Sequence, residues 1–328
     1  MNYQFSQQNY NIIQQDGRVY NGISDKGAQY IGEGIKKLEN LRDLDLNLGF
    51  NGLTYKGAKH IGEGIKELKS LTNLDLNLSN NRSISEQGVQ YISEGIKELK
   101  NLTNLKLDLE SNGISEQEAQ YISEGIKELK NLTNLSLYLG DYGILDKGAQ
   151  YISKVIRQLK SLTNLDLNLC GNGISEQGAQ FISEAIKELK SLTILNLNLW
   201  ENRIADKGAQ YISEAIIELK NLTNLELTLR KNEISDKGAQ YIGEAIKELK
   251  NFSNLDLNLS DNGIVEQGAQ YISEGIKQQK KLTDLYLNLW KCDISDKGAQ
   301  YIGEAIKELQ NLSNLNLNLD FIQMYSGK

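Results

Sequence analysis

Residues 102–131 read LTNLKLDLESNGISEQEAQYISEGIKELKN, and nearly the same thirty letters recur from residue 21 to the C-terminus. The residue that opens each copy marks the period: Leu41, Leu71, Leu102, Leu132, Leu162, Leu192, Leu222, Phe252, Leu282 and Leu312. The period is thirty residues, with one additional residue near Arg82 and Ser83. One such unit cannot bury its own apolar face, so the sequence predicts a stacked array in which each unit packs against its neighbours.

Each copy contains the patterns of one strand and one helix. Leu105, Leu107 and Leu109 alternate with polar residues, which is the period of a half-buried strand. Asn112 follows, where an amide can bond the backbone of a turn, and we expect the asparagines of successive copies to form a ladder. A residue such as Ser115 then N-caps a helix that has an acidic first turn and one apolar stripe.

The phrase L-x-x-L-x-L-x-L-x-x-N-x-I, followed by a helix containing G-A-x-x-I, resembles the leucine-rich repeat. It is most similar to the ribonuclease-inhibitor-like subfamily, in which a full α-helix follows every strand. The resemblance covers roughly residues 21–322 in ten matches. One departure is systematic, because an extra Leu-x pair, seen at Asp108 and Leu109, precedes the asparagine; two residues preserve the in/out parity of the strand.

The resemblance implies an α/β fold, a leucine-rich-repeat solenoid shaped as a right-handed α/β horseshoe. The parallel sheet is expected on the concave side and the helices on the convex side, because helices need more lateral room than strands. Residues 1–20 lack the leucine phrase and are expected to form a degenerate N-terminal cap or a partly disordered segment. Residues 21–322 are expected to form a single solenoid of about ten 30-residue repeats, and residues 323–328 a short C-terminal tail.

Charge and hydropathy exclude several classes of partner. The formal net charge is −7, from 43 acidic and 36 basic residues, and the basic residues do not cluster. This balance argues against a nucleic-acid or anionic-membrane surface and favours a protein partner with a basic or mixed-polarity surface. Polar residues interrupt every apolar run well before bilayer length, so we expect no membrane-spanning segment.

Compartment and redox state follow from two further observations. The N-terminus MNYQFSQQNYNIIQQDGR lacks the apolar stretch and cleavage site of a secretory signal, and we therefore expect a cytoplasmic protein. Cys170 and Cys292 are four repeats apart, about 19 Å at the spacing of stacked strands, so we expect both thiols to be free.

The residue types of catalysis and cofactor binding are scarce. The single histidine, His60, occupies a column held by tyrosine or phenylalanine in the other repeats, which favours packing over chemistry. Neither a Cys/His metal cluster nor a phosphate-binding glycine loop is present in the sequence. We therefore expect no enzyme activity, no metal and no cofactor.

The outward positions of the strands line the concave face, and repeat packing does not specify them. They are mostly asparagine and acidic residues, so this face is expected to be a polar, acidic floor with a negative potential. Aromatic and other unusual residues interrupt it. The candidate protein-binding residues are Tyr138, Tyr142, Ile194, Trp200, Arg230, Tyr286, Trp290, Asp75, Asp108, Asp166, Glu226 and Asp256. The alternative for any single acidic residue is that it is a solvated member of a polar face.

Three functions remain open at this point. The first is a non-enzymatic protein-interaction module or scaffold, acting alone or as a subunit of a larger assembly, because the resemblance implies protein partners that include nucleases, receptors and small GTPases. The second is an activator of a small GTPase, which one branch of this repeat group provides; Arg230, beside Lys231 and Asn232, is the candidate residue. The third is capture of a cation such as calcium by the Asp-x-Asn strands, which offer few ligands per site.

Overall fold

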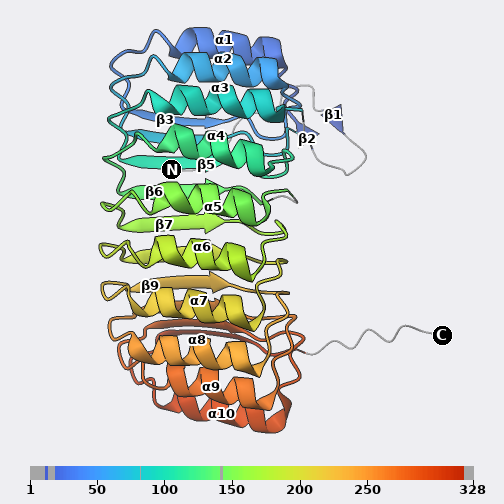
Figure 1. The fold of residues 1–328 in the computed structure, drawn as a ribbon, viewed down its shortest axis with the longest axis vertical. Coiled ribbons are helices and arrows are strands. Elements are labelled where there is room, and N and C mark those ends of the chain that lie inside the picture. The colour runs from blue at the N-terminus through green and yellow to red at the C-terminus, as the bar shows by residue number, and fades with distance from the viewer. Residues whose placement is uncertain (1–11, 14–18, 82, 141–142, 321–328) are drawn as a thin grey trace, which may run out of the picture.

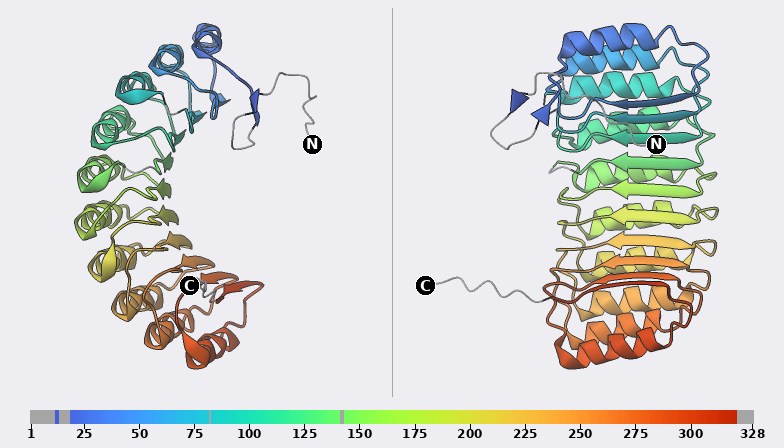
Figure 2. Two further views of the ribbon diagram at one scale, coloured as in Figure 1. Left: turned by 90° about the vertical axis from the view of Figure 1, so that its right-hand side faces the viewer. Right: turned by 180° about the vertical axis from the view of Figure 1, so that it is seen from behind.

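The fold is an open horseshoe of stacked strand–helix units. The computed structural model describes residues 12–13, 19–81, 83–140 and 143–320. Ten strands form one parallel sheet on the inner side of the arc, and ten helices lie along the outer side (Figure 2). The predicted fold class is confirmed, with the parallel sheet concave and the helices convex.

Strands and helices alternate along the chain (Figure 1). The sheet contains β3 (Asp43–Asn47), β4 (Asn73–Asn77), β5 (Asn104–Asp108), β6 (Asn134–Tyr138), β7 (Asn164–Asn168), β8 (Ile194–Asn198), β9 (Asn224–Thr228), β10 (Asn254–Asn258), β11 (Asp284–Asn288) and β12 (Asn314–Asn318). The helices are α1 (Asp25–Ile35), α2 (Tyr55–Ile65), α3 (Ser85–Lys97), α4 (Glu116–Ile126), α5 (Leu145–Ile156), α6 (Glu176–Ile186), α7 (Ala205–Ile217), α8 (Asp236–Glu248), α9 (Glu266–Ile276) and α10 (Ser295–Lys307). A separate antiparallel pair is formed by β1 (Ile12–Ile13) and β2 (Val19–Tyr20).

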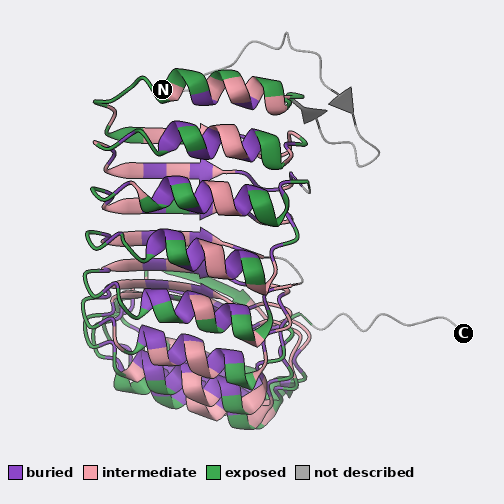
Figure 3. Cartoon of the chain, turned by 45° about the horizontal axis from the view of Figure 1, so that its top comes forward, coloured by how far each residue is buried: buried purple, intermediate pink, exposed green. Residues whose placement is uncertain are grey.

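The order of strands in the sheet follows chain order, with a helix in each connection, and equivalent residues pair directly, as Leu105 pairs with Leu135. Each inward leucine therefore lies against its own counterpart in the next repeat. Leu107 and Leu109 are almost fully buried, which confirms that the additional Leu-x pair keeps the parity of the strand. The buried stripes of strands and helices meet in one continuous core between the two layers (Figure 3).

The asparagine ladder is confirmed, and it joins each turn to the next. The Asn112 amide donates to the carbonyls of Leu109 (3.0 Å) and of Leu78 in the preceding repeat (2.9 Å), and its oxygen accepts the N–H of Asn81 (2.9 Å). One side chain thus satisfies buried backbone groups of two repeats. In the tenth turn Cys292 takes this position, and its Sγ donates to the carbonyl of Leu259 at 3.5 Å.

Helix starts are also linked from repeat to repeat. The predicted capping box of Ser115 and Glu118 is present. Elsewhere an aspartate of one helix caps the next helix: Asp146 accepts the N–H of Ser175 (2.8 Å), its hydroxyl (2.6 Å) and the N–H of Gly178 (3.0 Å). Asp25 and Asp206 make the same contacts one repeat onward. The carboxylate satisfies the free N–H groups of the neighbouring helix and favours its positive end.

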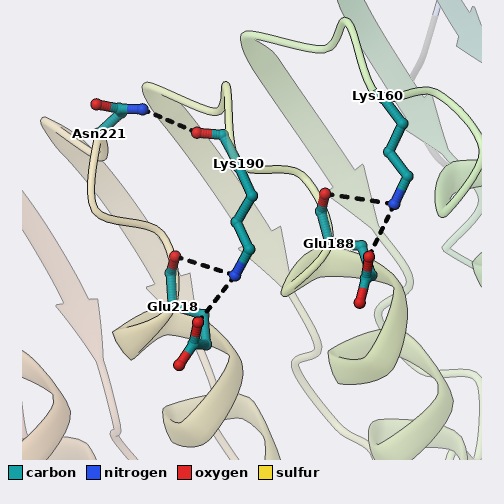
Figure 4. A network of polar contacts seen from close by, with 5 residues as sticks. All are labelled: Lys160, Glu188, Lys190, Glu218 and Asn221. Carbon is teal, nitrogen blue, oxygen red and sulfur yellow. Dashed lines mark hydrogen bonds and ion pairs between the residues drawn. The ribbon is translucent and has the colours of Figure 1, made fainter.

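A third set of contacts runs along the helix C-termini (Figure 4). The Lys190 ammonium donates to the Glu218 carboxylate (2.8 Å) and to its carbonyl (3.5 Å), while the Asn221 amide donates to the Lys190 carbonyl (2.8 Å). Lys160 and Glu188 repeat the arrangement. These pairs are exposed, so they contribute little to stability individually, but they hold consecutive repeats in one register.

None of the helices within the described ranges has the length and apolarity that crossing a bilayer requires.

The aspartate that caps the next helix can be tested by substitution. We expect Asp146→Ala to lower the free energy of unfolding by about 1 to 2 kcal/mol, because the N–H groups of Ser175 and Gly178 lose their acceptor. Glu176→Ala is the matched control at the same position of the next helix, and it should cost no more than about 0.5 kcal/mol. Equal losses in denaturant titrations of the two variants would contradict this assignment.

Candidate functional site: the concave face

The sequence-predicted residues lie along the concave face and its rim, but they differ in what surrounds them. Direct pairing of equivalent residues sets three side-chain rows on the floor of the sheet. In the N-terminal half of the first row, side-chain hydrogen bonds join neighbouring strands: the Asn134 amide donates to Asn104, and the Asn104 amide donates to Asn73. Ile194 interrupts this row of amides with an apolar side chain.

In the N-terminal part of the face, the charge of Asp75 is paired with a lysine of the same chain. Lys106 donates to Asp75 at 2.9 Å, and this bond, with the charges of Asp75 and its neighbours, raises the pKa of Lys106. The Lys106 ammonium also lies 6.0 Å from the ring centroid of Tyr138. Asp75 was predicted to be a binding residue, but its charge is already paired.

The middle of the face holds three half-buried acidic residues. The Tyr138 hydroxyl donates to Asp166 at 2.5 Å, and the Asn168 amide donates to Glu110. Burial, and then the charges of Asp108 and Asp166, raise the pKa of Glu110 to about 6. Burial is also the main cause of the raised pKa of Asp108 and Asp166. Their surroundings therefore disfavour the ionised form of these carboxyl groups.

The C-terminal part contains a hollow of about 690 Å³ above β8 to β12. Ile194 and Tyr286 lie at its walls with Glu226 and Asp256 between them, and the register sets Asp256 beside both Glu226 and Tyr286. Burial, and then the charge of Glu226, raise the pKa of Asp256 to about 6. Burial, and then the charge of Asp166, raise the pKa of Glu226. Within the described part of the chain, neither carboxylate has an ion-pair partner.

The two tryptophans and Arg230 form one stack at the rim, directly after the strands. The Arg230 guanidinium carbon lies 5.0 Å from the Trp200 ring centroid and 5.1 Å from that of Trp290. Ser260 occupies the intervening repeat and is buried. Lys291 covers Trp290 at 4.4 Å. Trp200 Nε1 and Arg230 Nε are buried without a hydrogen-bond partner, so cation–π contacts hold this stack.

The predicted residues thus separate into groups that the sequence did not reveal. Trp200, Arg230 and Trp290 come together, as do Ile194, Glu226, Asp256 and Tyr286, whereas Tyr142 lies outside the described residues. Sequence reasoning did not include two acidic residues of this face among the candidates: Glu110, in its middle, and Asp284, which lines the hollow. Glu110 occupies the column directly after the strand, the same column as Trp200, so a reading of that column would have found it.

The described residues contain no group of three or more His, Cys, Asp or Glu side chains placed to hold a metal ion. Neither Cys170 nor Cys292 forms a disulfide. The chemistry that the face offers is therefore that of carboxylates, amides and aromatic rings.

The comparisons with known proteins bear on the repeat itself. Residues 221–243 and 285–303 match the family model described as Leucine Rich repeat. These two segments are therefore similar to the leucine-rich repeat, in agreement with the solenoid fold described above. A comparison of the chain with curated proteins finds no match.

Solved structures show more distant likenesses to the chain. It is similar to an internalin from Listeria monocytogenes, with 15% identity and a TM-score of 0.37, over 90% of this chain and 94% of that one. It is also similar to actin-binding site 2 of leiomodin-1, with 15% identity and a TM-score of 0.35, over 50% of this chain and 87% of that one. At these scores neither likeness bears on the choice of partner.

The stack gives the two tryptophans a contact that contributes to stability as well as to the surface. We expect Arg230→Met to lower the free energy of unfolding by about 1 kcal/mol, because both indoles lose the cation between them. Trp200 and Trp290 are the two tryptophans of the chain, so the fluorescence emission should change as well. Arg203→Met, at an exposed arginine, should change neither quantity. Unaltered emission and stability in Arg230→Met would contradict the stack.

Proposed function

We propose that the protein is a non-enzymatic interaction module whose concave face binds a basic segment of another protein. The observation that carries this proposal is the pair of half-buried carboxylates, Glu226 and Asp256, which lack an ion-pair partner within the described residues and share a hollow with Ile194 and Tyr286.

The electrostatic argument rests on the raised pKa of Asp256. A carboxyl group with a pKa of about 6 carries its charge at neutral pH at a free-energy cost, because burial and Glu226 disfavour ionisation. A lysine or arginine side chain entering the hollow would remove that cost by adding an opposite charge. The two carboxylates therefore favour a cationic ligand over a neutral or anionic one.

The walls of the hollow can also contact the apolar stem of a lysine or arginine side chain. Lysine and arginine have apolar stems that pack on groups like Ile194, and their charged ends are attracted to an aromatic face such as that of Tyr286. The stack of Trp200, Arg230 and Trp290 lies at the rim of the same part of the solenoid and offers rigid aromatic area to a larger partner.

GTPase activation is less well supported by the geometry. That function would need a guanidinium free to reach a nucleotide, as an arginine finger does. Arg230 is instead stacked between two indoles, and its Nε is buried.

The remaining expectations belong to the same proposal. We assign the repeats to the ribonuclease-inhibitor-like subfamily, because helices of 11 to 13 residues follow the strands. We also propose a cytoplasmic protein, consistent with two cysteines that form no disulfide. Residues 21–322 would act as one solenoid, either alone or as a subunit of a larger assembly. The cap predicted at 1–20 lies largely, and the tail predicted at 323–328 entirely, outside the described residues.

A basic peptide tests the proposal directly. We expect a short oligolysine peptide to bind at physiological ionic strength, and an oligoglutamate peptide not to bind. The double variant Glu226→Gln/Asp256→Asn should weaken oligolysine binding about tenfold or more, which is about 1.4 kcal/mol. Binding should also strengthen from about pH 5 to about pH 7, because Asp256 loses its proton near pH 6 and the ionised form attracts the ligand.

The control removes the same charge elsewhere on the face. Asp43 and Asp45 are exposed on β3, at the opposite end of the sheet, so Asp43→Asn/Asp45→Asn should weaken binding only about twofold through net charge. If the two double variants weaken binding equally, the hollow is not the site.

A further inference from the structure

The two ends of the solenoid carry the two halves of an interface that the chain forms between every pair of neighbouring repeats. From this we infer that a second copy of the chain stacks on the first, with α1 and β3 of one copy against α10 and β12 of the other. This surface is distinct from the concave face, and the inference does not depend on the proposed function.

The C-terminal end exposes residues that are buried in the interior repeats. Leu315 and Leu317 of β12 are 46% and 36% exposed, whereas their counterparts Leu285 and Leu287 are 3% and 0% exposed. Among the described residues, β12 is paired on one side only, and β3 is likewise paired on one side only at the other end. A free parallel edge above an apolar surface is a template for another strand of the same kind.

The N-terminal end shows the complementary half. Tyr30 on α1 is 61% exposed and Leu38, which follows α1, is 48% exposed, while Leu68, the counterpart of Leu38, is fully buried. Both ends therefore present the apolar side chains that the internal contacts cover. Burial of such surface is the main source of stability in stacked repeats.

Glycines at the helix contacts show how closely the two ends would fit. Inside the solenoid, a Cβ on Gly243 would lie 2.3 Å from the carbonyl oxygen of Tyr271, and a Cβ on Gly275 would lie 2.3 Å from that of Gly243. These two glycine positions let α8 and α9 approach each other. Their counterparts at the ends are Gly303 on α10 and Gly34 on α1, and a Cβ on either would meet nothing within 4 Å. Gly34 and Gly303 thus have the residue type that close helix packing requires, but neither is covered by a neighbouring helix in the described part of the chain.

The helix cap points the same way. Ser24 starts α1 with φ −88° and ψ 177° and lacks a side-chain cap bond. Ser235, with φ −98° and ψ −173°, has its N–H and hydroxyl bound by Asp206 of the preceding helix. Asp296 occupies the Asp206 position on α10. In the stacked pair, the Asp296 carboxylate of one copy would accept the N–H and hydroxyl of Ser24 from the other.

This contact joins two different surfaces, so it is heterologous and each copy keeps one open end. We therefore expect the average mass in sedimentation or light scattering to rise with concentration beyond that of one chain. Gly34→Gln and Gly303→Gln each block one half. Both substitutions fall in open space on a helix, where glutamine is the better helix former, so each variant should fold and remain monomeric.

Mixing the two variants provides the decisive comparison. Gly34→Gln keeps an open C-terminal end and Gly303→Gln keeps an open N-terminal end, so an equimolar mixture should form dimers and nothing larger. Glu304→Gln, on the exposed side of α10, and Glu226→Gln/Asp256→Asn, on the concave face, should assemble like the unsubstituted protein. A constant mass of one chain at all concentrations would overturn the inference. Association of either glycine variant alone, or its absence in the mixture, would overturn it equally.

Discussion

The structure depends on the stacking of equivalent residues at a period of thirty. Because each strand pairs in direct register with the next, the strand leucines and most of the asparagines face their own counterparts. The unmet hydrogen-bonding groups of one turn or helix are then satisfied by side chains one repeat away, as Asn112 does for Leu78 and Asp146 for Ser175. Local sequence and long-range contact therefore specify the same arrangement, which is the condition for a repeat array to fold.

The same regularity makes the departures informative. A column of identical side chains is explained by stacking, whereas Asp256 lies next to Glu226, and burial together with the charge of Glu226 raises the pKa of Asp256. Such an arrangement does not contribute to the fold and is retained at a cost, which is what a site for a cationic ligand requires. Trp200, Arg230 and Trp290 differ, because cation–π contacts between them also contribute to stability.

Much of the fold could be predicted, because patterns of residues close together in the sequence determine it. The alternation of Leu105, Leu107 and Leu109 gave the buried face, and Asn112 and Ser115 gave the turn and the helix cap. The groupings within the site could not be predicted in the same way. Pairing of Asp75 with Lys106, and the stacking of Arg230 on Trp290 two repeats away, depend on side-chain reach across the sheet, which one repeat does not encode.

Hydrogen exchange of the backbone amides in dilute solution measures the central claim, that each repeat is stabilised by both neighbours. The account predicts slow exchange in the inner strands β5 to β10, where both edges are paired, and the fastest exchange of the sheet in β3 and β12, which are paired on one edge. Exchange that is equally slow in β3 and β12, or fastest in the middle of the sheet, would contradict stabilisation by nearest neighbours.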